Sequence, residues 1–111
     1  MVLPAQRIEA ARMVQRLAHE LRSAGYPVLP ILDIGFNDAQ REYGHCQRMV
    51  EGGRSIGASI TLSERCWEEG PSCLKSTILH ELVHAIPDTH QHDAKFRAYA
   101  KEIGAKYGLV L

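Results

Sequence analysis

The sequence lacks several features that define whole classes of protein. No apolar run is long enough to span a membrane, and the N-terminal residues lack the apolar core of a signal peptide. Lys and Arg total 13, and Asp and Glu also total 13, so the composition shows no strongly basic surface for nucleic acid. We therefore expect no membrane partner, and the net charge does not support DNA as a partner.

Cysteine is also scarce. The chain has three cysteines, Cys46, Cys66 and Cys73. Their odd number and the absence of a C-x-x-C pair argue against a disulfide scaffold and against a cysteine zinc ribbon. A reduced protein in the cytoplasm is the simplest interpretation. No repeat or low-complexity segment interrupts the 111 residues, and we expect one domain over residues 1–111.

Hydrophobic periodicity predicts an α+β fold with three helices. The first helix is expected from about residue 4 to residue 24, and two more are expected at 71–86 and 93–107. Pro71 suits the first turn of the second helix, and Asp93 suits the N-cap of the third. The apolar stripe of the first helix is expected to contain Ile8, Ala11, Val14, Leu17 and Leu21.

The middle of the chain predicts a small sheet of about three strands. Residues 28–36 form an apolar segment in which Pro30 indicates a late start or a position at the sheet edge. Residues 43–50 and 55–62 are typical of a hairpin, because Gly52 and Gly53 lie between them. Residues 63–70 are interpreted as a polar connection in which Trp67 packs against the edge of the core.

Residues 80–84 carry the strongest signal for function. They read H-E-x-x-H within a predicted helix, so His80 and His84 project from one face and can bind one metal ion. Glu81 lies one step round the helix, where its carboxylate can reach a water beside the metal. This combination of two ligands and a general base on one helical turn is that of the zincin metalloproteases.

A catalytic zinc site needs about three protein ligands and one open position. The segment after the helix offers Asp88, His90 and His92, and Asp93 follows directly. Imidazole matches zinc better than carboxylate beside two other imidazoles. Glu102 is a further candidate, since thermolysin-like zincins take a glutamate from a later helix. The residues alone leave the choice between His90 and His92 open.

From residue 40 to residue 107 the sequence resembles a SprT-like metalloprotease domain, the group that includes the Spartan proteases of DNA–protein crosslinks. The matching stretches are Gly44-His45-Cys46, Ser59-Ile60-Thr61-Leu62-Ser63, His80-Glu81-Leu82-Val83-His84-Ala85, and His92 with Phe96 four residues later. In that family the third histidine stands four residues before an aromatic residue, which selects His92. Family members usually have glycine beside this histidine, whereas Gln91 and Asp93 flank it here.

The resemblance implies a minimal zincin-like fold and a zinc-dependent endopeptidase. Zn²⁺ would be held by His80, His84 and His92, with Glu81 as the catalytic general base. An extended polypeptide would add as a strand to a sheet edge formed by residues 58–63. The small size of the domain favours flexible or unfolded substrates, and DNA-associated proteins are among the substrates that the resemblance implies.

Two other functions compete with this hypothesis. The first is a non-catalytic module that binds zinc or a partner and keeps the site for stability. The second is a metal-dependent nuclease, since some small three-histidine zinc folds cleave RNA, although Glu81 argues against it. No residue can be identified that stabilises an oxyanion, and Tyr99 and His45 are the candidates.

Overall fold

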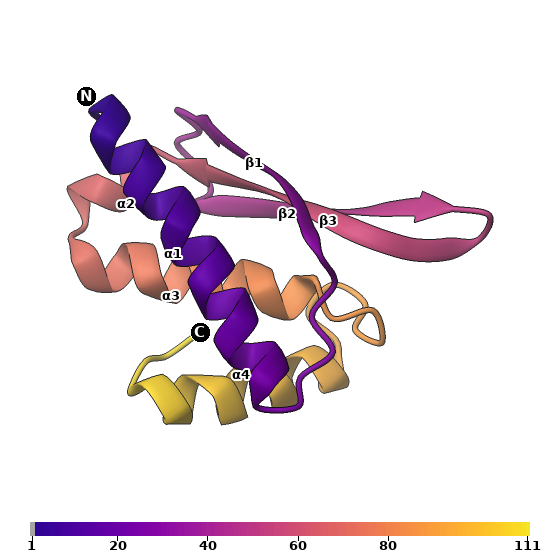
Figure 1. Ribbon diagram of the computed structural model, residues 1–111. Helices are drawn as coiled ribbons and strands as arrows, with labels where there is room; N and C mark the ends of the chain where they lie inside the picture. Colours follow the sequence, from indigo (N-terminus) through magenta and orange to yellow (C-terminus); the bar gives the residue numbers. More distant parts are fainter. Residues whose placement is uncertain (1) are drawn as a thin grey trace.

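The computed structural model describes residues 2–111, which form four helices and one three-stranded sheet (Figure 1). The helices are α1 (Pro4–Ser23), α2 (Arg65–Glu68), α3 (Pro71–His84) and α4 (Ala94–Tyr107), and the strands are β1 (Ile31–Asn37), β2 (Gly44–Glu51) and β3 (Arg54–Ser63). The α+β class, the zincin-like arrangement and the number of strands are confirmed. Only α2 was not predicted, because a helix of four residues is too short to show helical periodicity.

The strand order is β1-β3-β2, with β1 parallel and β2 antiparallel to β3. The prediction of a free sheet edge at residues 58–63 is therefore wrong. These residues pair with β1 on one side and with β2 on the other, so their backbone groups are already bonded. The strand edge that stays unpaired beside α3 belongs to β2. The effect of Pro30 is as expected, because β1 begins one residue later and lies at the other edge.

Helix α1 covers part of the core with one apolar stripe. Val14, Leu17 and Leu21 are buried as predicted, together with Ala10 and Ala18. Ile8 was predicted in this stripe but is 55% exposed. At 3.6 residues per turn Ile8 lies roughly 140° around the helix from the centre of the stripe, so it points to solvent.

Helix α3 lies between the sheet and α4 (Figure 1) and has the largest buried share of the four helices. Its buried stripe includes Leu74, Ile78 and Leu82, and Ile86, two residues after the helix ends, is buried as well. Trp67 packs against the edge of the core, as predicted. Its ring centroid lies 6.0 Å from that of Phe36, and only part of its surface is exposed. This packing holds α3 in a fixed orientation under β2 and β3.

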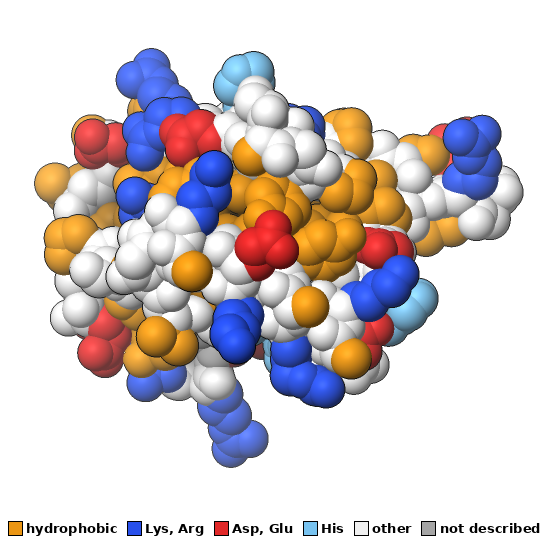
Figure 2. Space-filling model, turned by 90° about the horizontal axis from the view of Figure 1, so that it is seen from below, with side chains coloured by type: hydrophobic (Ala, Val, Ile, Leu, Met, Phe, Trp, Pro, Cys, Tyr) orange, Lys and Arg blue, Asp and Glu red, His pale blue; other side chains and the backbone are white. Residues whose placement is uncertain are grey.

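Charged side chains are scattered over the surface. On the face shown in Figure 2, Lys and Arg side chains stand apart, with acidic and apolar side chains between them. No continuous basic surface is visible there, which agrees with the balanced composition. Among residues 2–111, no helix combines the length and the apolar character needed to cross a membrane.

Candidate metal centre

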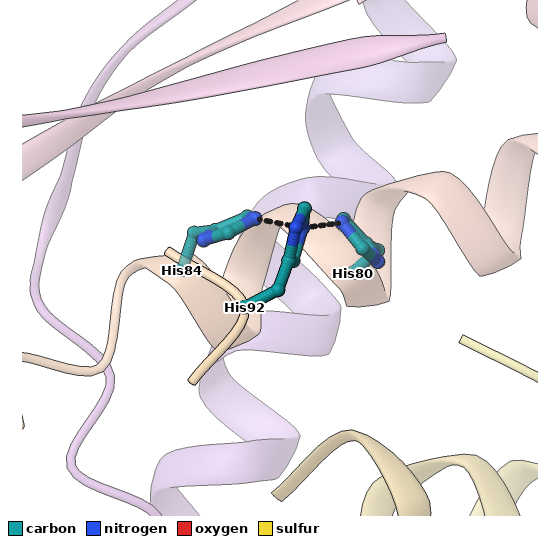
Figure 3. Close-up of side chains that lie close together, drawn as sticks. All are labelled: His80, His84 and His92. Carbon is teal, nitrogen blue, oxygen red and sulfur yellow. Dashed lines mark hydrogen bonds between the residues drawn. The ribbon is translucent and has the colours of Figure 1, made fainter. Parts of the chain in front are cut away.

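Three histidines converge beside the C-terminal end of α3. His80 and His84 project from the helix, and His92 reaches them from the loop that follows it (Figure 3). The Nε2 atom of His92 lies 3.2 Å from the Nε2 atoms of both His80 and His84. The three side chains form a group whose ligand atoms can hold one metal ion. The structure thus brings together the three histidines that the sequence singled out.

The distances between the nitrogens fit a shared cation. Zinc binds imidazole at about 2.0–2.1 Å with near-tetrahedral angles, which places two ligating nitrogens about 3.3 Å apart. The two measured separations of 3.2 Å are close to this value. Hydrogen bonds alone do not explain the arrangement, because the single Nε2 of His92 cannot bond fully to both neighbours. A cation at the centre satisfies all three lone pairs at once.

Two of the histidines are in the form that binds metal. Burial, together with the neighbouring histidines, lowers the pKa of His84 to about 4. Burial also lowers the pKa of His80, and His92 adds to this effect. Both imidazoles are therefore neutral near pH 7 and can donate a lone pair.

The Phe96 ring packs against all three imidazoles. Its ring centroid lies 5.0 Å from that of His80, 4.3 Å from that of His84 and 4.9 Å from that of His92. The side chain is only 3% exposed and belongs to the core. The spacing of four residues between His92 and Phe96 therefore has a direct packing reason, since both side chains meet the two helix histidines.

The loop before α4 holds His92 through its backbone. Asp93 is the N-cap of α4, accepting a bond of 2.8 Å from the amide of Phe96, and it also accepts a bond from the amide of His90. Arg97 donates to the carbonyl oxygen of His92 at 2.7 Å. Gln91 has a φ of 52°, in the left-handed region that favours glycine. A glycine beside the third histidine, usual in the family that the sequence resembles, would suit this backbone.

Arg48 of β2 connects the sheet to this loop. Its guanidinium donates to the carbonyl oxygens of His84 and Pro87, both at 2.9 Å, and to the carbonyl oxygen of Thr89. It also bonds the Thr89 hydroxyl at 2.8 Å, and this buried hydroxyl donates in turn to Ile86. We refer to Arg48 and Thr89 as the loop brace. Sequence analysis missed it, because Arg48 lies 36 residues or more before its partners.

Glu81 is buried at the junction of α3 and β2. Its side chain is only 5% exposed, and no hydrogen bond to its carboxylate is found among residues 2–111. Burial raises the pKa of Glu81 to about 7 in the metal-free chain, and the nearby Glu42 adds to this effect. A cation at the histidines would lower this pKa again. In the metal-free chain the carboxylate can therefore take up and release a proton near neutral pH.

Gly44 makes room for the Glu81 side chain. A Cβ atom at Gly44 would lie 2.8 Å from the Thr77 methyl carbon and 3.1 Å from Cγ of Glu81. Real Cβ atoms essentially never approach another heavy atom to within 3.0 Å, so any larger residue would displace the helix or the carboxylate. The glycine in the Gly-x-Cys stretch thus has a steric role beside the general-base candidate.

The side chains of Glu81 and the three histidines line one cleft of about 710 Å³. One wall is β2, which contributes Gly44, Cys46 and Arg48, and the opposite wall is α3. Burial raises the pKa of the Cys46 thiol to about 12, so this cysteine is protonated in the metal-free chain, and it is not part of the metal-ligand group. The cleft therefore combines a three-nitrogen metal site with one carboxylate.

The remaining candidates from the sequence lie elsewhere. Among residues 2–111, His90 and Glu102 are not part of the metal-ligand group, and Glu102 accepts a hydrogen bond from Tyr26. Asp88 forms an ion pair with Lys95 at 3.2 Å. Tyr99 bonds Asp88 and does not line the cleft, whereas His45 does line it. The structure thus places Glu102 apart from the metal-ligand group and Tyr99 outside the lining of the cleft.

Comparison with known proteins gives one match. Residues 30–110 match the family model described as "SprT-like family". The matched segment includes the whole sheet, α3, the loop and α4, and therefore all three histidines and Glu81. No curated protein and no solved structure matches the chain significantly.

Proposed function

This chain belongs to the SprT-like family, and on that premise we propose that it is a zinc-dependent endopeptidase. The observation that carries the proposal is the meeting of the three Nε2 atoms with the buried carboxylate of Glu81 in one cleft. Three neutral imidazoles are the ligand set of catalytic zinc sites with one open position. A buried carboxylate beside such a site supports hydrolysis rather than a purely structural role.

His80, His84 and His92 would hold the zinc ion. When bound, zinc supplies Lewis acidity, which lowers the pKa of a coordinated water toward 7 and polarises a peptide carbonyl. Phe96 fixes the three rings from below, and the loop brace fixes the backbone that carries His92. The metal ligands are thus held in position before the metal binds, which limits the conformational entropy lost on metal binding.

Glu81 would act as the general base and then as the general acid. Its carboxylate accepts the proton of the attacking water and delivers it to the nitrogen of the leaving amine. The burial that raises its pKa in the metal-free chain keeps it near the range in which both steps are accessible. Gly44 leaves room for the carboxylate, because a side chain at this position of β2 would collide with it.

An extended substrate would pair with the free edge of β2. This strand pairs with β3 on one side and forms a wall of the cleft with the other. A peptide added along β2 would gain main-chain hydrogen bonds and pass over the three histidines. Such binding requires an extended segment, so flexible or unfolded polypeptides are the expected substrates.

The test compares cleavage of an unfolded protein by wild type, Glu81→Gln and Glu69→Gln at equal zinc content. Glu69→Gln is the matched control, since Glu69 is exposed between α2 and α3 and does not line the cleft. Loss of general-base catalysis should lower kcat/KM of Glu81→Gln by about 10²–10⁴-fold. The control should keep most of the activity.

Equal activity of Glu81→Gln and wild type, or cleavage by neither when both are loaded with zinc, would contradict the proposal. Adding single-stranded DNA to each reaction tests the DNA-associated role that the resemblance implies. A rise in the wild-type rate that Glu81→Gln does not show would support that role, and an unchanged rate would oppose it.

A further inference from the structure

A second pocket opens beside the metal centre. It has a volume of about 660 Å³ and lies between α4 and the residues that follow it. His80, His92 and Leu111 line both this pocket and the cleft described above. A ligand held at the three histidines would therefore stand at the mouth of the second pocket, which we refer to as the side pocket.

The interior of the side pocket is mainly apolar. Besides the two histidines, its lining includes Phe96, Ala100, Leu109 and Val110. Val110 is 94% exposed, so this apolar surface is open to solvent in the free protein. Apolar concave surfaces next to a reactive centre are typical of sites that bind a substrate side chain.

The chain segment that walls the side pocket is fixed in place. The amide of Leu109 donates to the carbonyl oxygen of Gly104 at 2.8 Å, and the Ser76 hydroxyl donates to the carbonyl oxygen of Val110 at 3.3 Å. A Cβ atom at Gly104 would lie 2.5 Å from the Leu109 carbonyl oxygen, so the close approach requires glycine. The pocket is thus built by contacts of its own and does not depend on a ligand.

The rim of the side pocket is positively charged. Arg97 and Lys101 lie one helical turn apart on α4, and both line the pocket. Neither forms an ion pair among residues 2–111, and no Asp or Glu side chain lines the pocket. The rim therefore favours an occupant with a negative charge beside its apolar part.

We propose that the side pocket binds a large apolar side chain of the substrate next to the scissile bond, with preference for an acidic residue beside it. The inference rests on the proposed peptidase function, and it names the substrate class of that same site. A peptide along β2 that crosses the histidines brings one neighbouring side chain to the mouth of this pocket. Apolar contact selects that side chain, and Lys101 selects the adjacent charge.

The test uses binding to the zinc-loaded protein, so that it does not depend on catalysis. The probes are short peptide hydroxamates that differ only in the side chain next to the hydroxamate, leucine or alanine, each with glutamate or lysine as the following residue. Calorimetry measures their affinity. We expect leucine to bind at least about 10-fold more tightly than alanine, as for loss of several methylene groups from an apolar pocket.

Two pairs of variants locate the effect. Ala105→Phe fills the pocket from an exposed position and should remove the preference for leucine, whereas Ala98→Phe, exposed on the same helix outside the pocket, should keep it. Lys101→Glu should reverse the preference for glutamate over lysine, and Lys106→Glu should not. The lysine variants change only exposed side chains, so they keep the test valid if Ala105→Phe fails to fold.

Equal affinity for the leucine and alanine probes, including no binding of either, would overturn the proposal. Single-stranded DNA that displaces the glutamate probe from wild type but not from Lys101→Glu would also overturn it, because the rim would then be a nucleic-acid contact. Discrimination between the probes without cleavage of any protein would keep the side pocket and reject the peptidase. Cleavage of a protein without discrimination between the probes would keep the peptidase and reject the side pocket.

Discussion

Replacing Arg48 with methionine would show how strongly the loop brace controls metal binding. Methionine keeps much of the length and apolar bulk of the side chain but removes the guanidinium group. That group donates to three carbonyl oxygens and one hydroxyl of the segment 84–89, and all of these bonds would be lost together. The helix that carries His80 and His84 would keep its own packing.

The loss of stability can be bounded from the contacts. A hydrogen bond from a charged donor contributes roughly 1.5–3 kcal/mol, but bonds that share one side chain do not add. The carbonyl of exposed Pro87 can bond water instead, whereas Thr89 is fully buried and cannot be rehydrated easily. We therefore expect Arg48→Met to lower the free energy of unfolding of the metal-free protein by about 2–4 kcal/mol.

The effect on metal affinity follows from the position of His92. It lies three residues after Thr89, so a loosened loop must be ordered again when His92 binds metal. Loss of groups that orient a metal ligand typically costs about 10–100-fold in affinity, or roughly 1.4–2.7 kcal/mol. His80 and His84 stay on α3, so a weaker site with two histidines should remain.

Competition with a chromogenic zinc chelator measures this affinity, at a temperature at which circular dichroism shows every variant to be folded. Arg54→Met is the matched control, because Arg54 is exposed at the start of β3 in the same hairpin and forms no ion pair among residues 2–111. Arg48→Lys keeps the charge but not the planar set of donors, and should fall between the two. A folded Arg48→Met protein that binds zinc within about twofold of wild type would refute the reasoning.

Three further predictions concern the centre itself. His92→Ala should lower zinc affinity at least about 100-fold, and His90→Ala, outside the cluster, less than about threefold; the reverse order in the chelator assay would reject the ligand set. Gly44→Ala should lower kcat/KM at least about 10-fold, whereas Gly35→Ala, whose Cβ would meet only an ordinary contact of 3.7 Å, should be neutral; equal rates would argue against the steric role of the glycine. In the metal-free protein, burial lowers the pKa of His84 to about 4. When the pH falls below about 6.5, this histidine is therefore protonated in the unfolded chain but not in the folded chain, which lowers the free energy of unfolding. Glu81, whose pKa burial raises to about 7, opposes this loss, because the folded chain then holds a proton that the unfolded chain releases above about pH 4.5. Urea melts should therefore show a larger loss for Glu81→Gln than for wild type between about pH 6.5 and 4.5, and equal losses would contradict the burial effect.

The helices and the metal motif could be predicted because their signals are local. Helix α3 shows its apolar stripe and its two histidines within 14 residues, and the structure places both as expected. The third histidine could not be selected from the residues alone, since His90 and His92 are two residues apart in one loop. The choice depends on how the loop turns, which Arg48 and the φ of Gln91 help to set. Neither the hydrogen bonds of Arg48 nor the backbone angle of Gln91 leaves a periodic pattern in the sequence.

The position of β1 could not be predicted either, and it has the largest consequence for function. A hairpin of two strands offers two edges, and the sequence of a third strand does not state which edge it will join. Here β1 joins β3, which leaves the edge of β2 unpaired directly above the histidines. Had β1 joined β2, its backbone would occupy the place that an extended substrate needs. The prediction of a free edge at residues 58–63 was wrong for this reason. Substrate binding by strand addition is still proposed, but at the edge of β2. The parallel pairing of β1 with β3 thus does two things: it completes the core on the side of α1, and it keeps open the one strand edge that borders the metal centre.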